Sequence, residues 1–294
     1  MKAKEGLTFR SGYWDDRPAK ERFKEFLISI HGLDLSLWEQ KGYWDDEHYT
    51  AFSFFDGDRV VATTNLFSME MVVDGVRRKL GQFSGVGTAP EFRGRGLNRW
   101  LTDKALEWAA PTHDGFFLFA DQDAVSFYAK CGFVPVGETI TGLMVEPQTH
   151  RPGLRKLNPE SDDDLALIYR LACERSPVSD LLGASNAKLL MFHCLYTLRD
   201  CLYFVPDLDV AVFFDVDGGC LTLFDVVGRR IPSFADLHPY ISGQRHSEVR
   251  FSFMPDKMGV EPTGQTTLRD SNAHVYPPLR LPEPERLFPY ASRA

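Results

Sequence analysis

The spacing of hydrophobic and polar positions predicts two helices followed by strands in the first third of the chain. Over residues 18–30 the hydrophobic side chains recur at helical spacing, and a second short helix is predicted around residues 35–38. Three strands separated by glycine-containing turns are then expected over residues 50–55, 60–73 and 78–88. These elements predict an antiparallel meander.

After residue 90 the pattern changes to alternating helices and strands. A loop rich in glycine and arginine leads into a helix whose hydrophobic side chains lie at four-residue spacing, from Leu97 to Ala109. Residues 116–120 form a short apolar strand of the kind that is buried on both faces. A helix over 124–130 and a last strand over 139–145 follow. A strand, helix and strand in this order indicate a parallel crossover, so the predicted fold class is a mixed α/β sheet.

A proline-containing stretch near residue 150 with few large hydrophobic residues marks a predicted domain boundary. We therefore expect one domain over residues 1–148 and a smaller α/β domain over residues 155–294. In the second domain, helices are predicted over residues 165–173, 187–199 and 234–241, and strands over residues 201–205, 210–216, 221–227 and 249–254. The tail after Pro255 is rich in proline and polar residues, and no element is predicted there.

Composition and charge narrow the classes of function. The formal net charge of -8 argues against a nucleic-acid partner. It would suit a cationic substrate, but acidity for solubility alone is the better explanation. No apolar run approaches the roughly 20 residues of a membrane helix, and the N-terminus lacks the pattern of a signal peptide. The five cysteines form no C-x-x-C pair, and the histidines lack ligand spacing. We therefore expect no metal, no membrane partner and reduced thiols in a cytoplasmic protein.

The most informative segment runs from a strand end into a helix. Small residues in Val86-Gly87-Thr88 let a ligand lie close to the backbone, and the free N–H groups at the start of the next helix form an anion site. Two arginines in the loop add donors suited to phosphate. A Walker loop is excluded because Gly-Lys-Ser/Thr is missing, and a dinucleotide loop fails at its third glycine. A glycine-rich turn with solvated arginines remains the alternative. The loop reads Arg93-Gly94-Arg95-Gly96-Leu97-Asn98.

This loop resembles the pyrophosphate loop of the GNAT superfamily of N-acetyltransferases, R/Q-x-x-G-x-G/A. The departure is Asn98, where the family usually has Gly or Ala. A second stretch is similar to the family's N-x-x-A-x-x-F-Y-x-K-x-G-F motif, with Asp121 in place of the usual Asn. It reads Asp121-x-x-Ala124-x-x-Phe127-Tyr128-x-Lys130-x-Gly132-Phe133.

The resemblance implies a GNAT fold for the first domain, with acetyl-coenzyme A as cosubstrate and no metal. It implies that a bulged strand splays from the next parallel strand, and that Val86, Gly87 and Thr88 bind the pantetheine arm there. Tyr128 is implied as the general acid that protonates the leaving thiolate. The remaining implied cofactor-binding residues are Arg93, Gly94, Arg95, Gly96, Leu97, Asn98 and Asp121.

The general base stays open. Gln82 occupies the position where several family members carry an acid, and it cannot accept a proton at neutral pH. Ser84 is a poor base, and a water chain is an alternative. A motif of two aromatic residues followed by two aspartates occurs twice, as Tyr13-Trp14-Asp15-Asp16 and as Tyr43-Trp44-Asp45-Asp46. The two copies either hold a cationic amine or reflect ordinary packing and helix caps. Other acidic candidates for the base are Glu70, Asp45 and Asp46.

The order of elements in the second half resembles that of a degenerate GNAT-like domain in a tandem protein. Val227-Gly228-Arg229-Arg230 lies where a phosphate loop would fall but lacks its pattern. This domain is expected to complete the acceptor pocket, cover a sheet edge or form a homodimer. The predicted function is transfer of an acetyl group to a primary amine of a small molecule by direct attack. A non-catalytic coenzyme A sensor and a protein-lysine acetyltransferase are the alternatives.

Overall fold

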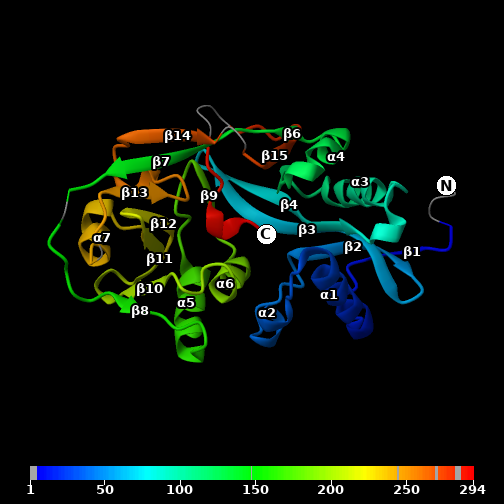
Figure 1. Ribbon diagram of the computed structural model, residues 1–294, viewed down its shortest axis with the longest axis horizontal. Coiled ribbons are helices and arrows are strands. Elements are labelled where there is room, and N and C mark those ends of the chain that lie inside the picture. Colours follow the sequence, from blue (N-terminus) through cyan, green and yellow to red (C-terminus); the bar gives the residue numbers. More distant parts are fainter. Residues whose placement is uncertain (1–4, 147, 244, 269–270, 282–285) are drawn as a thin grey trace.

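Two mixed β-sheets stand side by side, with helices against both of their faces (Figure 1). The computed structural model describes residues 5–146, 148–243, 245–268, 271–281 and 286–294. The strand order in the first sheet is β1-β2-β3-β4-β5-β15-β6, with β9 paired to β3. In the second sheet it is β14-β7-β13-β12-β11-β10-β8. The predicted mixed α/β architecture is confirmed.

The first sheet is built around two long strands joined by a tight turn, and β4 also pairs in parallel with β5. The crossover between β4 and β5 predicted from the sequence is thereby confirmed. The strands are Thr8–Ser11 (β1), Tyr49–Asp56 (β2), Arg59–Val73 (β3), Val76–Thr88 (β4), Gly115–Phe119 (β5), Val134–Pro135 (β6), Leu182–Ala184 (β9) and Ala273–Tyr276 (β15).

Helices lie on both faces of this sheet: α3 and α4 on one, α1 and α2 on the other (Figure 1). The ends of α1 follow from its sequence, because Asp16 Oδ1 accepts a hydrogen bond from the Ala19 N–H at 3.1 Å and Gly32 ends the helix in the left-handed conformation. The helices are Arg17–His31 (α1), Ser36–Gln40 (α2), Leu97–Ala109 (α3) and Val125–Lys130 (α4).

The second sheet carries α7 on one face and α5 on the other, where α5 and α6 contribute to the core shared with the first sheet. Its strands are Glu138–Met144 (β7), Arg155–Lys156 (β8), Leu202–Val205 (β10), Val210–Asp217 (β11), Cys220–Val227 (β12), Glu248–Phe251 (β13) and Gly264–Leu268 (β14). The helices are Asp162–Glu174 (α5), Ala187–Leu195 (α6) and Phe234–Ile241 (α7).

The two sheets exchange strands along the sequence. We expected β7 to complete the first sheet, and this was wrong: it pairs with β13 and β14 in the second sheet. Conversely, β15 comes from the tail where no element was predicted, and it inserts between β5 and β6 of the first sheet. Hydrophobic alternation marks a strand but does not specify its partner, which explains both errors. The predicted boundary near residue 150 therefore does not separate the sheets.

A shared hydrophobic core joins the two sheets. It contains Phe23 and Leu27 of α1, Ile168 of α5, Leu190 of α6 and Phe288 near the end of the chain, all essentially inaccessible to solvent. Separate cores lie under α3 and under α7. The end of the chain reaches the middle of the molecule, between the two sheets (Figure 1). Helices of the second half and the last residues are thus placed beside the first sheet.

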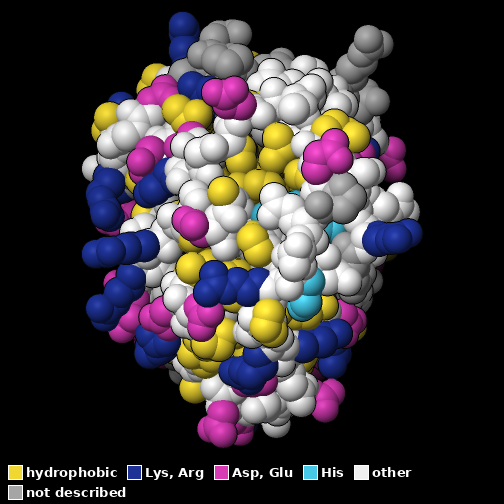
Figure 2. Space-filling model, turned by 90° about the vertical axis from the view of Figure 1, so that its left-hand side faces the viewer, with side chains coloured by type: hydrophobic (Ala, Val, Ile, Leu, Met, Phe, Trp, Pro, Cys, Tyr) yellow, Lys and Arg dark blue, Asp and Glu magenta, His cyan; other side chains and the backbone are white. Residues whose placement is uncertain are grey.

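The end of the molecule formed by the second sheet has a mixed surface. Figure 2 shows hydrophobic side chains emerging in the middle of this face, with basic side chains gathered along one edge and acidic ones interspersed. Among the residues that the structure describes, no helix has both the length and the apolar character to cross a membrane.

Candidate active site

A bulge in β4 forms the centre of the site. Thr63 pairs with Gly87 and Asn65 with Ser84, so two residues of β4, Gly85 and Val86, stand opposite one residue of β3. Gly85 has a φ of +54°, which favours glycine. The Asn65 side chain donates to the carbonyls of Ser84 and Gly85 at 3.2 and 3.1 Å. The bulge expected from the family resemblance is present, and buried hydrogen bonds hold it.

Beyond the bulge, β4 separates from its parallel neighbour. Pairing between β4 and β5 extends from Leu80 opposite Gly115 to Phe83 opposite Leu118, whereas β4 continues to Thr88. The backbone of Val86, Gly87 and Thr88 therefore lies beyond the last residues at which the two strands pair. This is the place predicted for the pantetheine arm.

The predicted phosphate loop follows directly. Gly94 and Gly96 have φ values of +74° and +70°, and α3 starts after Gly96 without a side-chain cap, which leaves its first N–H groups available to an anion. Arg93 Nε donates to the Thr88 carbonyl at 3.2 Å, and Arg95 donates to the Glu91 carbonyl at 3.1 Å. Both arginines are exposed but tied to the loop backbone.

Unlike the two exposed arginines, the last two residues of the loop motif have buried side-chain atoms. Leu97 is the first residue of α3, and its side chain is buried in the core beneath the helix. The Asn98 side-chain oxygen is buried without a hydrogen-bond partner among the described residues. Asn98 is also where the sequence departs from the family pattern.

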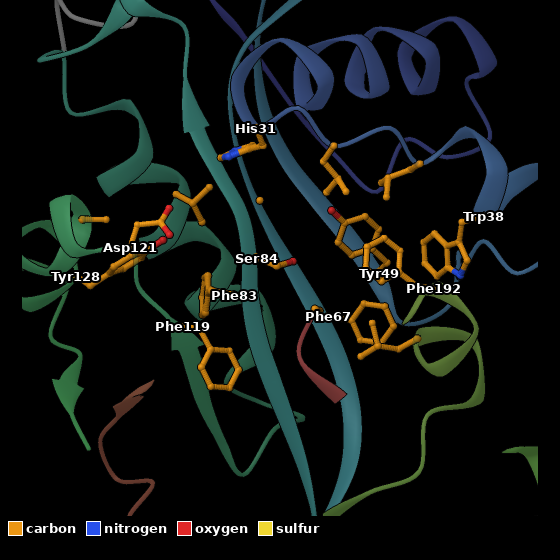
Figure 3. Close-up of a pocket in the computed structure, with 17 residues that line it drawn as sticks. His31, Trp38, Tyr49, Phe67, Phe83, Ser84, Phe119, Asp121, Tyr128 and Phe192 are labelled. Carbon is orange, nitrogen blue, oxygen red and sulfur yellow. The ribbon is translucent and has the colours of Figure 1, made fainter. Parts of the chain in front are cut away.

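A cavity of about 370 Å³ opens at the bulge. In Figure 3, β4 runs through the middle of the view: Asp121, Tyr128, Phe83 and Phe119 lie on one side of it, and four aromatic residues lie on the other. Of the predicted site residues, Val86, Asp121 and Tyr128 line this cavity, while Gly87 and Thr88 continue along β4 and the loop begins five residues further on. The aromatic residues on the other side are Trp38, Tyr49, Phe67 and Phe192.

Tyr128 occupies α4 and is 7% exposed. Burial raises the pKa of its phenol above the ordinary value, and the Cys131 thiol and the Asp121 carboxylate add to the rise. The hydroxyl therefore stays protonated at neutral pH and is suited to donate a proton.

His31 is a site residue that sequence analysis missed. It ends α1, and although the residue is exposed, a Cβ built on Gly87 would lie 3.0 Å from its Nε2. Its imidazole points across β4 toward Asp121 (Figure 3). Desolvation lowers the pKa of His31, and the Asp121 carboxylate opposes this in part. The ring is thus neutral at neutral pH, as a proton acceptor must be.

The end of the chain forms one wall of the cavity, which was not foreseen either. Ala294 lines the cavity, and its backbone oxygen accepts a hydrogen bond from Gln82 Nε2 at 3.0 Å. Gln82 is completely buried, so it anchors this segment. Arg293 forms an ion pair with the buried Glu138 at 2.8 Å, and its carbonyl accepts from the buried His193 at 2.8 Å.

The repeated aromatic and acidic motif does not contribute to this cavity. Trp14 and Trp44 pack edge to face at 5.1 Å in the core, Asp16 caps α1, and Asp45 pairs with His48 at 2.9 Å. Ordinary packing and capping therefore account for the motif. Asp45 and Glu70 line a different cavity, whereas Ser84 lines the active-site cavity beside Tyr49.

One segment in the first half of the chain is similar to a known protein family. Residues 34–136 match the model of a protein family described as acetyltransferase (GNAT) domain. No curated protein matches the chain. This domain contains the bulge, the loop and Tyr128.

Solved structures with the same fold extend the likeness to both sheets. A probable N-acyltransferase from Enterococcus faecalis superposes with a TM-score of 0.60 at 11% identity, covering 92% of this chain and 71% of that one. GCN5-related N-acetyltransferases from Anabaena variabilis and Kribbella flavida give TM-scores of 0.58 and 0.54 at 14% and 16% identity, covering 91% of this chain and 72% and 71% of theirs. The chain therefore has the fold of these solved structures, and its residues 34–136 are similar to the acetyltransferase (GNAT) domain.

Proposed function

We propose that the protein transfers an acetyl group from acetyl-coenzyme A to the primary amine of a small molecule. The observation that supports this most strongly is the position of Tyr128. A protonated, buried hydroxyl lines a cavity at the point where a bulged β4 separates from β5. A leaving thiolate at this point would find its proton donor in place.

The cofactor would lie along the parted strands. Its pantetheine arm would pair with the backbone of Val86, Gly87 and Thr88, and its pyrophosphate would meet the start of α3. Arg93 and Arg95 are the nearest donors of positive charge in that loop, and their contacts with the loop backbone reduce the freedom they lose on binding phosphate. Asp121 would help to orient the end of the arm beside Tyr128.

The chemistry is a direct attack. The neutral amine nitrogen forms a bond to the thioester carbon, and the tetrahedral intermediate collapses as the carbon–sulfur bond breaks. Tyr128 gives its proton to the departing sulfur. The amine loses one proton, for which His31 is the acceptor that we propose, because its neutral imidazole reaches across β4 toward the same point (Figure 3). The products are an amide and the free thiol.

Binding and turnover can be separated. Titration of acetyl-coenzyme A should show saturable binding, and thiol release should then depend on an added amine. Binding without thiol release for any amine would indicate a non-catalytic sensor. Release with peptidyl lysine but with no small amine would indicate a protein acetyltransferase.

The role of His31 has its own test. Because its pKa is lowered, kcat/KM expressed per neutral amine should fall only as the pH drops below 6.5, the ordinary pKa of histidine. In His31→Gln the rate should drop by about tenfold or more, and this acid limb should disappear. An unchanged acid limb in the variant would assign the proton to another acceptor.

A further inference from the structure

The far part of the active-site cavity is apolar and rigid. Four segments that are distant in the sequence meet there, from α1–α2, β2, β3 and α6. Trp38 and Phe192 stand edge to face at 6.1 Å, and Tyr49 and Phe67 lie 5.8 Å apart. The Trp38 indole N–H donates to the Lys188 carbonyl at 2.9 Å, and the Trp38 backbone N–H donates to the Tyr196 hydroxyl at 3.1 Å. This wall is therefore fixed and has few free polar groups.

The cavity also has few charged side chains among the described residues that line it. Asp121 is the single acidic side chain among the described residues that line it, and it lies on the Tyr128 side. The other acidic side chains near α2 and β3, such as Asp45 and Glu70, face a separate cavity. The aromatic side chains on the other side of β4 carry no carboxylate, so the additional ammonium groups of a polyamine would lose hydration there that no carboxylate replaces, which is costly.

We infer that the acceptor is a primary monoamine with an apolar, preferably aromatic, body that lies against the wall formed by Trp38, Phe67 and Phe192. The inference rests on the proposed function, because it assigns the second substrate of the same reaction. With its nitrogen near His31 and Ser84, the body of such an amine would extend away from Tyr128 to the aromatic side of β4 (Figure 3). A cavity of about 370 Å³ suits a small molecule of this kind.

Phe192 belongs to α6, in the half of the chain that follows the GNAT domain. It packs on Tyr196 at 4.8 Å and on Trp38, so α6 contributes selectivity from outside the family-matched residues 34–136. Removal of its ring should open the apolar end of the cavity and leave β4, the loop and Tyr128 untouched.

The test compares amines and variants in one assay of thiol release. The amines are 2-phenylethylamine, hexylamine, ethanolamine and spermidine, with kcat/KM expressed per neutral amine. We expect 2-phenylethylamine to exceed ethanolamine and spermidine by about tenfold or more. Phe192→Ala should lower kcat/KM for 2-phenylethylamine about tenfold and leave ethanolamine nearly unchanged. Phe192→Leu should lower kcat/KM for 2-phenylethylamine by an intermediate factor, and it replaces the alanine variant in the test if that variant does not fold.

Phe204→Ala is the matched control, because Phe204 is also half-buried and packs against the same core but does not line the cavity. It should leave the amine preference unchanged. Equal or better turnover of ethanolamine or spermidine would overturn the acceptor class while the acetyltransferase function stands. Binding of acetyl-coenzyme A with no release for any amine would refute the function itself.

A longer acyl chain is the other possible occupant of the apolar space, and the assay distinguishes it. Acetyl-, butanoyl- and octanoyl-coenzyme A are compared with one amine. If Phe192→Ala alters the preference among these thioesters and not among the amines, the aromatic wall holds the acyl chain and the inference is wrong. The expected result is an unchanged acyl preference.

Discussion

The two sides of β4 are built in opposite ways. The predicted cofactor side comes from one continuous stretch, in which the bulge, the loop and Tyr128 follow one another between residues 81 and 133. The aromatic side combines the end of α1, α2, two strands, α6 and the last residue of the chain. Local conformation and helix-terminus chemistry determine the first, whereas long-range packing determines the second.

Tyr128→Phe should give the largest effect, because it removes the proton donor on the cofactor side. We expect kcat to fall by about 100-fold or more, with the dissociation constant for acetyl-coenzyme A unchanged. Steady-state kinetics and a binding titration measure the two quantities. Tyr276→Phe is the control: Tyr276 packs beside Phe133 at 5.2 Å but does not line the cavity. Equal turnover in both variants would remove Tyr128 from the mechanism.

Glu138→Gln tests how the end of the chain supports the acceptor side. It leaves the Arg293 charge without its carboxylate, and we expect a loss of about 3 kcal/mol in the free energy of unfolding. The KM for the amine should also rise, because Ala294 lines the cavity. The comparison variant is Asp225→Asn, which breaks the buried Arg175–Asp225 pair of 2.7 Å away from the cavity. If both variants changed KM alike, the effect would reflect general destabilisation.

The stability of the molecule should fall in acid through His193. Burial lowers the pKa of His193 to about 4, so between that value and the ordinary pKa of 6.5 the unfolded chain binds the extra proton. Stability therefore decreases as the pH falls through this window, by up to about 3 kcal/mol. Denaturant titrations of the protein and of His193→Gln at pH 7 and pH 4.5 measure the difference. Identical pH dependence in the two proteins would contradict this prediction.

Arg95→Gln should give the smallest effect, on the cofactor side. One exposed guanidinium near a phosphate is worth about 1 kcal/mol or less, so the dissociation constant for coenzyme A should rise by up to about fivefold. Added salt should reduce the difference. Arg99→Gln, which removes an exposed arginine on α3 that pairs with Asp103, is the control. If the dissociation constant rose by the same factor in both variants, the effect would come from the loss of any positive charge and not from Arg95 in particular.

Sequence reasoning was most successful where local rules apply. The hydrophobic spacing located α1, α3 and the long strands, and the glycine and arginine pattern located the loop at the start of α3. His31 was missed because a single histidine at a helix end carries no signal without knowledge of what lies opposite. The anchoring of Ala294 by Gln82 was missed because the two residues are 212 positions apart. The placement of β7 in the second sheet and of β15 in the first was missed because the alternation of hydrophobic and polar residues does not encode which strands pair.

A structure of the protein with coenzyme A would test the division between the two sides of β4 most directly. We predict that the pantetheine arm lies between β4 and β5, that its sulfur is within hydrogen-bonding distance of the Tyr128 hydroxyl, and that the part of the cavity lined by Trp38, Phe67 and Phe192 stays open. An arm that filled the aromatic space, or a sulfur on the side of β4 away from Tyr128, would contradict the account.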